Sequence, residues 1–278
     1  MNLLKSIYVS AYITLAVVAC VVALRGLTEA GLASAWLGTL IAAGLPAGFF
    51  ARLFLRPTAR TSAQLPGLLG GSALGLALAL LLGGGPAAVW ALFAGPLGFA
   101  IYVVWYSRFG QREAGALAPG GTLPTVPFED AEGRPLSSDA LLGKPTVWIF
   151  YRGNWCPLCM AQIREVAAQY REIAARGAQV VLISPQPAAN SRSLSQRFDA
   201  PMHFVVDRDN QAARRLGVLA EKGLPAGMQL LGYDSDVPLP TVFITDAQGR
   251  ILYADLTSNY RIRPEPAEFL RVLDAGAA

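Results

Sequence analysis

Four long apolar segments in the first 106 residues constrain the fold of this chain more than any other feature. They cover about residues 6–24, 32–55, 65–84 and 86–106, and each has about the 20 mostly apolar residues that a helix needs to cross a bilayer. One such segment alone is compatible with a buried core helix. Four in succession predict an N-terminal four-helix transmembrane bundle over residues 1–110.

Charged residues flank these segments and are nearly absent from them. Residues 1–110 contain six Lys or Arg and one acidic residue, a net charge of +5, and the remainder carries −1, which together give the +4 of the whole chain. The basic balance therefore belongs to the membrane flanks, and we expect no nucleic-acid partner for the polar half. The 53% hydrophobic content also excludes a disordered chain.

The distribution of Lys and Arg predicts the orientation. With four spans, the N-terminus, the loop after the second span and the region after the fourth share one side of the membrane. That side carries six basic residues and the other only Arg25, so the positive-inside rule places the polar half in the cytoplasm, at a bacterial-type inner membrane. A periplasmic polar half is the alternative if the span count differs. The six residues are Lys5, Arg52, Arg56, Arg60, Arg108 and Arg112.

Small residues at four-residue spacing occur in two of the spans, and such spacing lets helix backbones approach closely. Chance spacing in Ala- and Gly-rich helices explains the pattern equally well. The spans hold no acidic residue, so nothing marks an ion path through them. The glycines are Gly44 and Gly48 in the second span and Gly67, Gly71 and Gly75 in the third.

The polar half begins with a segment rich in Gly and Pro, residues 111–125, which predicts a linker. Residues 126–278 then alternate between β-rich apolar runs and helical periodicity, which predicts a layered α/β domain with a mixed central sheet. The expected strands are 146–151, 179–184, 204–206, 242–245 and 250–254, and the expected helices are 160–177, 211–216 and 266–273.

Two of the three cysteines form a close pair, Cys156-x-x-Cys159, directly after the first of these strands. Pro157 suits the first position of a helix, which places Cys156 at the helix start, where free amides and the helix dipole favour a thiolate. Arg152 is a further candidate for stabilising that charge. Cys159 lies within disulfide reach of Cys156. The motif predicts a redox-active disulfide, with Cys156 as nucleophile and Cys159 as resolving cysteine.

Zinc sites use the same cysteine spacing, so metal binding is the alternative interpretation. A closed structural zinc site needs two further ligands. The chain offers only Cys20, in the first span, and His203, its single histidine. We therefore expect no bound metal and no cofactor.

Four segments of the polar half carry a family resemblance. They are Leu141–Pro145, Phe150–Cys159 (FYRGNWCPLC), Leu239–Asp246 and Asn259–Pro266. Through them, residues 122–278 resemble the AhpC/TSA peroxiredoxin-like branch of the thioredoxin-fold superfamily. The resemblance implies a thioredoxin-like fold and an oxidoreductase or antioxidant activity. The membrane half has no counterpart in that family.

The chain departs from the usual peroxiredoxin motif, Pro-x-x-x-Thr-x-x-Cys. Ile149 replaces the proline, and Gly153 replaces the threonine that orients the peroxide. The family's later arginine is also absent, with Pro240 in its place. Pro240-Thr241 resembles instead the cis-proline of thioredoxins, which implies that this dipeptide and Trp155 shape the substrate-contact surface.

Three functions are compatible with these features. The leading hypothesis is a membrane-tethered thiol–disulfide oxidoreductase that acts on protein or small-molecule disulfides, with an unidentified thiol as electron donor. The alternative is a thiol peroxidase in which Cys156 becomes a sulfenic acid and Cys159 resolves it. The third is a redox-sensing or metal-binding membrane module.

The role of the spans and the partners of two C-terminal arginines each have two interpretations. The spans contain one cysteine, Cys20, and no pair, so they anchor the domain in the lipid bilayer or bind a partner and do not pass electrons by dithiol exchange. Arg261 and Arg263 either form ion pairs with Glu265 or Glu268, or approach the dithiol.

Overall fold

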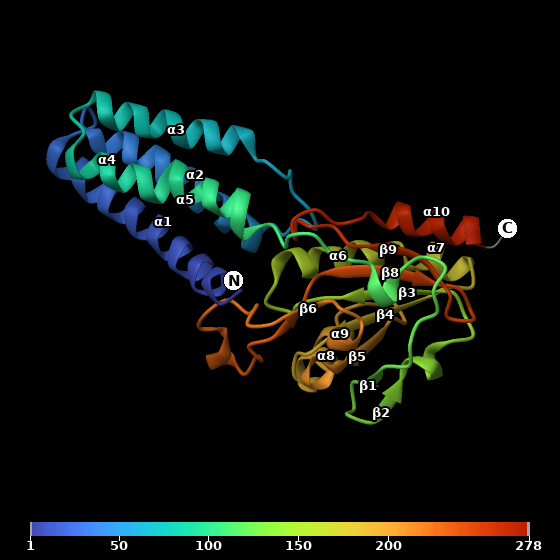
Figure 1. The fold of residues 1–278 in the computed structure, drawn as a ribbon. Coiled ribbons are helices and arrows are strands. Elements are labelled where there is room, and N and C mark those ends of the chain that lie inside the picture. The colour runs from blue at the N-terminus through green and yellow to red at the C-terminus, as the bar shows by residue number, and fades with distance from the viewer. Residues whose placement is uncertain (1, 277–278) are drawn as a thin grey trace. The chain divides into compact units, whose positions relative to one another are not determined.

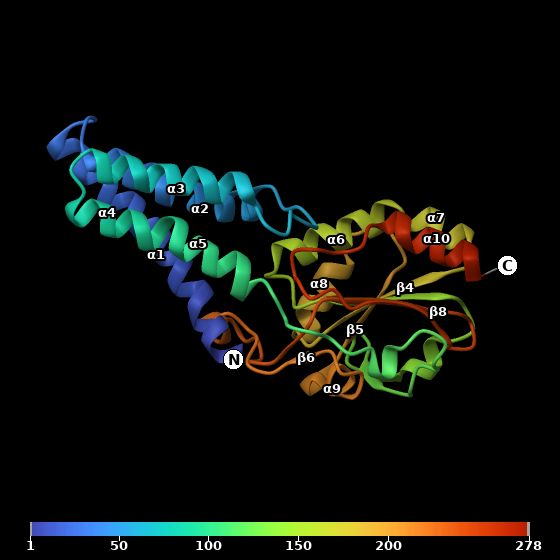
Figure 2. The same ribbon diagram turned by 45° about the horizontal axis from the view of Figure 1, so that its top comes forward.

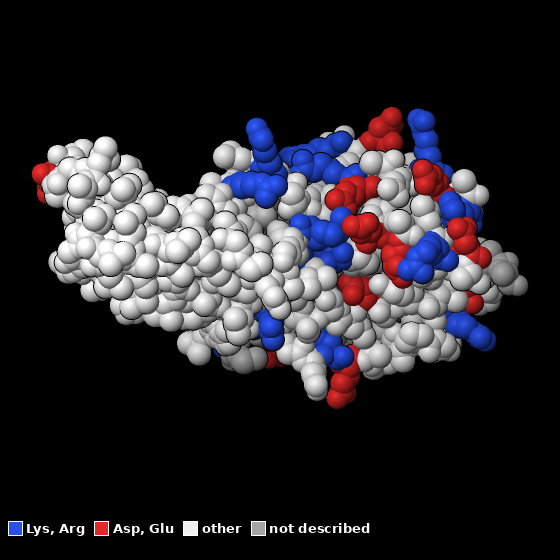
Figure 3. Space-filling model, turned by 90° about the horizontal axis from the view of Figure 1, so that it is seen from above, with Lys and Arg blue, Asp and Glu red and all other residues white. Residues whose placement is uncertain are grey.

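The structure, a computed structural model, describes residues 2–276 and divides into two compact units. The first comprises Leu3–Pro57 and Thr61–Arg108, and the second comprises Thr58–Arg60 and the chain from Phe109 onward. Figure 1 shows that the first unit is helical and that the second is a sheet flanked by helices. On the face shown in Figure 3, the first unit is nearly free of charged side chains, whereas basic and acidic side chains are interspersed over the second.

Three helices of the first unit are long and apolar enough to cross a membrane. They are α1 (Asn2–Ala30), α2 (Ala35–Leu55) and the helical segment Gly85–Tyr106, with 29, 21 and 22 residues. The last consists of α4 (Gly85–Leu92), η1 (Phe93–Leu97), α5 (Gly98–Ile101) and η2 (Tyr102–Tyr106), where η1 and η2 are π-helical turns. Pro96 disrupts the helix there, and Gly95 leaves the helical region, because proline cannot donate the helical hydrogen bond.

The remaining apolar helix, α3 (Pro66–Leu81), is shorter than the predicted span 65–84. Its 16 residues extend about 24 Å at 1.5 Å per residue, less than the roughly 30 Å of a bilayer core. The helix stops early because Gly83 and Gly84 adopt positive φ angles of 119° and 63°. The structure therefore supports three candidate spans by length and composition, and not the predicted bundle of four.

A close contact between α2 and α3 depends on glycine. A Cβ atom added at Gly38 would lie 2.2 Å from the backbone nitrogen of Ala79, and one added at Gly75 would lie 2.5 Å from that of Ala42. Of the glycines expected at helix contacts, Gly75 and Gly71 have close neighbours, whereas three face open space. Those three are Gly44, Gly48 and Gly67.

The second unit is built on a mixed sheet of seven strands in the order β2-β1-β5-β4-β3-β8-β9. Strands β3, β4 and β5 are parallel, and the other neighbouring pairs are antiparallel, so the predicted mixed α/β fold is confirmed. The strands are β1 (Pro127–Glu129), β2 (Pro135–Ser137), β3 (Thr146–Phe150), β4 (Gln179–Ser184), β5 (His203–Val206), β8 (Thr241–Thr245) and β9 (Ile251–Asp255).

Helices cover both faces of this sheet (Figure 2). α6 (Pro157–Ala168), α7 (Tyr170–Ala175) and α10 (Pro266–Gly276) lie on one face, and α9 (Gln211–Arg215) lies on the other. α8 (Ala188–Ser195) connects β4 to β5. The expected single helix 160–177 is divided into α6 and α7 at Gln169.

Residues 111–125, predicted as a linker, are packed into the second unit instead. Leu117 and Leu123 are 0% and 6% exposed and belong to the main core, together with Trp148 and Phe243. Backbone hydrogen bonds join Gly120 and Gly121 to Ile251. The Gly- and Pro-rich composition gives an irregular chain here, and the apolar residues within it hold that chain on the domain.

Candidate active site

The turn from β3 into α6 positions the cysteine pair. All five residues of β3 are buried in the middle of the sheet, and the loop Tyr151–Trp155 follows it. Cys156 is the N-cap of α6 and Pro157 is its first residue, where the missing amide of proline costs no hydrogen bond. The structure thus places both residues where the motif predicts them.

The two sulfurs face each other across the first turn of α6. The backbone amide of Cys159 donates to Sγ of Cys156 at 3.4 Å. Nη2 of Arg263 lies 3.5 Å from Sγ of Cys159 and 4.0 Å from Sγ of Cys156. Both cysteines are free thiols and are buried, with 2% and 0% exposure for Cys156 and Cys159. One guanidinium therefore contacts both reactive atoms.

Arg263 is itself held rigidly. Its Nε donates to the carbonyl of Tyr260 at 3.2 Å, and its Nη1 donates to Oε1 of Gln162 at 2.9 Å. Of the two options that the sequence left open for Arg263, the structure shows the approach to the dithiol. Spacing could not have decided this, because Arg263 is 104 residues from Cys159 along the chain.

The two thiols titrate as a coupled pair. Burial raises the pKa of Cys156 well above its usual value. Burial acts in the same direction on Cys159, but the hydrogen bond from Cys156 and the charge of Arg263 outweigh it and lower the pKa of Cys159 to about 5. One thiolate, nearer Cys159, and one proton are therefore shared at neutral pH.

This charge distribution differs from the sequence prediction, in which the helix start alone ionises Cys156. The amide of Cys159 does point at Cys156, as that argument requires. The guanidinium of Arg263 is closer to Cys159, however, and a full positive charge outweighs one amide dipole. The thiolate therefore belongs to the pair and not to Cys156 alone.

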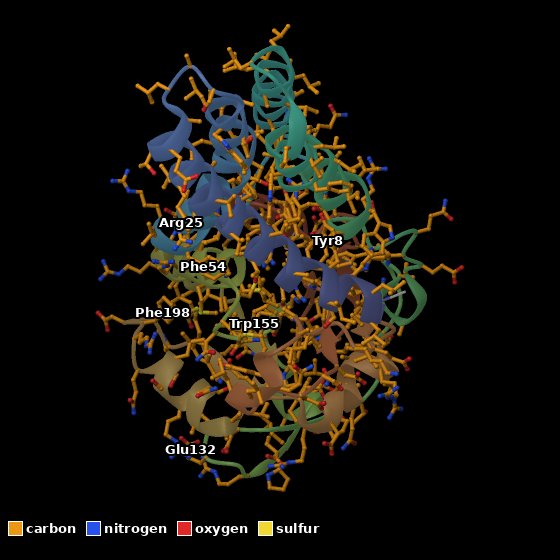
Figure 4. The ribbon with its side chains drawn as sticks, turned by 90° about the vertical axis from the view of Figure 1, so that its left-hand side faces the viewer. Tyr8, Arg25, Phe54, Glu132, Trp155 and Phe198 are labelled. Carbon is orange, nitrogen blue, oxygen red and sulfur yellow. The ribbon has the colours of Figure 1, made fainter. Side chains whose placement is uncertain are left out.

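Arg152 and Trp155 form a small stack beside the pair. Nη2 of Arg152 donates to the carbonyl of Gly223 at 2.6 Å, and its guanidinium carbon lies 4.8 Å from the centre of the Trp155 ring. Trp155, labelled in Figure 4, also makes an edge contact with Tyr233. These contacts hold the segment from β6 (Leu219–Ala220) to β7 (Val237–Pro238) over the loop that precedes Cys156.

Gly153 allows Trp155 to occupy its position. Gly153 has φ +144°, and a Cβ added there would lie 2.6 Å from Nε1 and 2.8 Å from Cδ1 of Trp155. The indole therefore fills the space where the threonine of the peroxiredoxin motif would begin its side chain. No hydroxyl group is available at this position to orient a peroxide.

A buried hydrogen-bond network fixes the same loop. The amide of Asn154 donates to Oε1 of Gln186 at 2.9 Å, and Nε2 of Gln186 donates to the hydroxyl of Tyr151 at 2.9 Å. The hydroxyl of Tyr233 donates to Oδ1 of Asn154. Sequence reasoning missed this network, because residues bonded to each other in it are up to 79 positions apart and form no local motif.

Pro240 and Thr241 lie at the start of β8, where Thr241 pairs with Phe150 at the end of β3. The expected cis-proline is wrong, since residues 2–276 contain no cis peptide bond; the trans form is the usual state of a bond before proline. The hydroxyl of Thr241 accepts from Nη2 of Arg112 at 2.5 Å and donates to the carbonyl of Leu239 at 2.9 Å. Its polar group is therefore used within the domain.

The side chains around the sulfurs can support thiol chemistry. Within the described part of the chain, no three His, Cys, Asp or Glu side chains gather as ligands for a metal ion. The site consists of the dithiol, the guanidinium of Arg263 in contact with both sulfurs, and the stack of Arg152 on Trp155. That set can bind an anionic sulfur and exchange disulfides.

The model of the AhpC/TSA family matches residues 115–254. Peroxiredoxin Q from Sedum lineare is 30% identical over 99 residues, which are 36% of this chain and 53% of that protein. The thiol-disulfide oxidoreductase ResA from Geobacillus thermodenitrificans is 26% identical over 161 residues, 58% of this chain and 79% of its own length. The putative peroxiredoxin bcp from Coxiella burnetii is 29% identical over 139 residues, 50% and 85% of the two chains.

Among solved structures, the peroxidoxin BcpB from Mycobacterium tuberculosis aligns with a TM-score of 0.47 and 22% identity, covering 56% of this chain and 96% of its own. The family match spans half of this chain and includes the cysteine pair, and the relatives are oxidoreductases. The chain is therefore an oxidoreductase that belongs to the AhpC/TSA family, within the thioredoxin-fold superfamily.

Proposed function

We propose that this chain is a membrane-tethered thiol–disulfide oxidoreductase in which Cys156 is the nucleophile and Cys159 the resolving cysteine. The observation that carries the proposal is the shared contact of Arg263 with both sulfurs, at 3.5 and 4.0 Å, at the start of α6. A guanidinium in this position stabilises the thiolate that exchange requires. Cys156 is also the slightly more exposed of the two residues.

The exchange takes place in two displacements. In the first, the proton of Cys156 passes to Cys159, and the Cys156 thiolate attacks a substrate disulfide. One substrate sulfur leaves as a thiolate and a mixed disulfide forms. In the second, Cys159 loses that proton and attacks Sγ of Cys156, which releases the other substrate sulfur and closes the Cys156–Cys159 disulfide. In this direction two electrons pass to the substrate, and a thiol donor then reduces the disulfide. The same two displacements in reverse oxidise substrate thiols.

The low pKa of Cys159 serves the second displacement, because a resolving cysteine that ionises readily attacks the mixed disulfide quickly. The test is to trap the intermediate. A Cys159→Ser chain cannot resolve, so it should accumulate a mixed disulfide through Cys156 with a model disulfide such as oxidised glutathione. A Cys156→Ser chain, which keeps Cys159, is the matched control. Accumulation through Cys159 only, or in neither chain, would contradict the assignment.

Thiol peroxidase activity is the second candidate, because two of the relatives above are named peroxiredoxins. In that reaction the Cys156 thiolate breaks the O–O bond of the peroxide, which forms a sulfenic acid and releases an alcohol or water. Cys159 then displaces water from the sulfenic acid to form the disulfide. The indole of Trp155 against Gly153 argues against it, since the orienting hydroxyl is missing. Stopped-flow oxidation by hydrogen peroxide separates the two, because a rate equal to that of a free thiolate leaves only disulfide exchange.

We also propose that α3 crosses the membrane despite its length, so that the second unit lies in the cytoplasm. With four crossings, six basic residues lie on one side and one on the other. With three crossings, they divide four to three, which gives no orientation. A short helix can be accommodated by local thinning of the bilayer. A reporter fused after the last residue tests the side, and activity of a periplasm-specific reporter would refute the proposal.

A further inference from the structure

Arg263 is a buried cation without a carboxylate partner. It is 5% exposed, and its hydrogen bonds go to the carbonyl of Tyr260, to the amide oxygen of Gln162 and to the two sulfurs. No acidic side chain of residues 2–276 forms an ion pair with it. Burying a guanidinium is unfavourable unless an anion accompanies it. In this site the anion is the thiolate of the pair.

Other charged or titratable groups near the pair do not replace the thiolate. Asp255 favours the charge of Arg263 from a distance without an ion pair. Arg152 adds positive charge near Cys156, and Tyr151 stays neutral because burial raises its pKa. The remaining neighbour is Arg60 of the same unit, which donates to the backbone carbonyl of Arg263 and forms ion pairs with Glu165 and Glu265.

The charge balance of the site therefore changes with its redox state. In the dithiol form, Arg263 has a thiolate beside it. In the disulfide form neither sulfur carries a charge, and Arg263 stays buried without its counter-ion. Stabilising the reduced form of a dithiol pair makes its disulfide a stronger oxidant.

We propose that Arg263 sets the net direction of the reaction, so that the Cys156–Cys159 disulfide oxidises substrate thiols. The inference rests on the dithiol exchange proposed above and adds the direction and the substrate class. The disulfide and two substrate thiols yield one protein thiol, one protein thiolate, one substrate disulfide and one proton. Two electrons move from the substrate to the protein, and the released proton reflects the thiolate that Arg263 retains.

The released proton gives a signature that a merely structural arginine would not produce. With glutathione as the reference thiol, the equilibrium constant for reduction of the protein disulfide should rise tenfold per pH unit between about pH 6 and 8, where glutathione stays protonated. If both sulfurs took up a proton on reduction, the equilibrium constant would not change with pH. The full chain with Cys20→Ala, in detergent, is equilibrated with glutathione buffers and its free thiols are counted by alkylation.

Variants of Arg263 test whether its positive charge causes this pH dependence. Arg263→Met should remove the slope and lower the equilibrium constant at neutral pH by at least about tenfold, the smallest effect usual for a neighbouring opposite charge. Arg263→Lys keeps a positive charge and should keep the slope. Arg261→Met removes another buried arginine from the same segment and should also keep it.

The outcomes separate this inference from the proposed function. A flat profile for the chain with native Arg263, or an unchanged slope in Arg263→Met, would overturn the role of Arg263 while leaving disulfide exchange in place. Failure to form any Cys156–Cys159 disulfide would overturn both. If Arg263→Met does not fold, the slope with native Arg263 and the Arg263→Lys variant still decide the matter.

Discussion

Replacing Gly153 with alanine should destabilise the second unit through two separate effects. The first is backbone strain, because φ +144° is a conformation that residues with a Cβ rarely adopt, at a cost of about 1–3 kcal/mol. The second is a clash, because the new Cβ would lie 2.6 Å from Nε1 of Trp155, and overpacking of this kind costs about 1–3 kcal/mol more. The expected total is about 2–6 kcal/mol in the free energy of unfolding.

Gly143→Ala provides the matched control. Gly143 has φ +95°, and a Cβ added there meets nothing within 4 Å, so it reports strain alone. Pulse proteolysis of the full chain across a denaturant series measures both variants. The double variant Gly153→Ala/Trp155→Ala should be less destabilised than the sum of the two single variants, because the clash is absent from it. The difference is the coupling energy between the two positions. If Gly153→Ala costs no more than Gly143→Ala, and the double variant shows no coupling, the indole does not occupy this space and the argument is refuted.

Three further changes test other contacts. Thr245→Val leaves Nε1 of Trp148 buried without the acceptor it has at 3.0 Å, so the free energy of unfolding should fall by about 1–3 kcal/mol, whereas an unchanged midpoint would contradict the bond. Arg152→Met removes the bond to Gly223, so hydrogen exchange should accelerate in residues 219–238; equal rates would show that the stack does not hold that segment. Gly75→Leu should separate α2 from α3 and lower the thermal stability of the first unit, with Gly67→Leu, in open space, as the silent control.

Apolar runs predicted the central elements of the second unit well. β4 occupies the expected residues 179–184, and β3, β5, β8 and β9 lie within a residue of theirs, because buried strands in a mixed sheet require continuous apolar sequence. β1, β2, β6 and β7 were missed, since strands of two or three residues carry no periodicity. The packed 111–125 segment was missed because its composition is that of a loop, and only tertiary contacts show that it is buried.

The candidate site was predictable where its residues are local in sequence. Cys156, Pro157 and Cys159 could be placed from a motif, because an N-cap and a first-turn proline are set by neighbouring residues. Arg263, which stabilises their negative charge, could not be placed from a motif. It follows β9 in the sequence and contacts the cysteines only because the chain folds back to them. The bond before Pro240 was likewise set by backbone conformation, whereas the early end of α3 follows from Gly83 and Gly84, which the sequence does show.

The shared thiolate is tested most directly by titrating the ultraviolet thiolate absorbance of the reduced Cys20→Ala chain against pH. The lowered pKa of Cys159 predicts one thiolate per chain at neutral pH, retained as the pH falls and lost only as it approaches about 5. Absence of any thiolate below about pH 8.5, the ordinary pKa of a cysteine, would contradict the account.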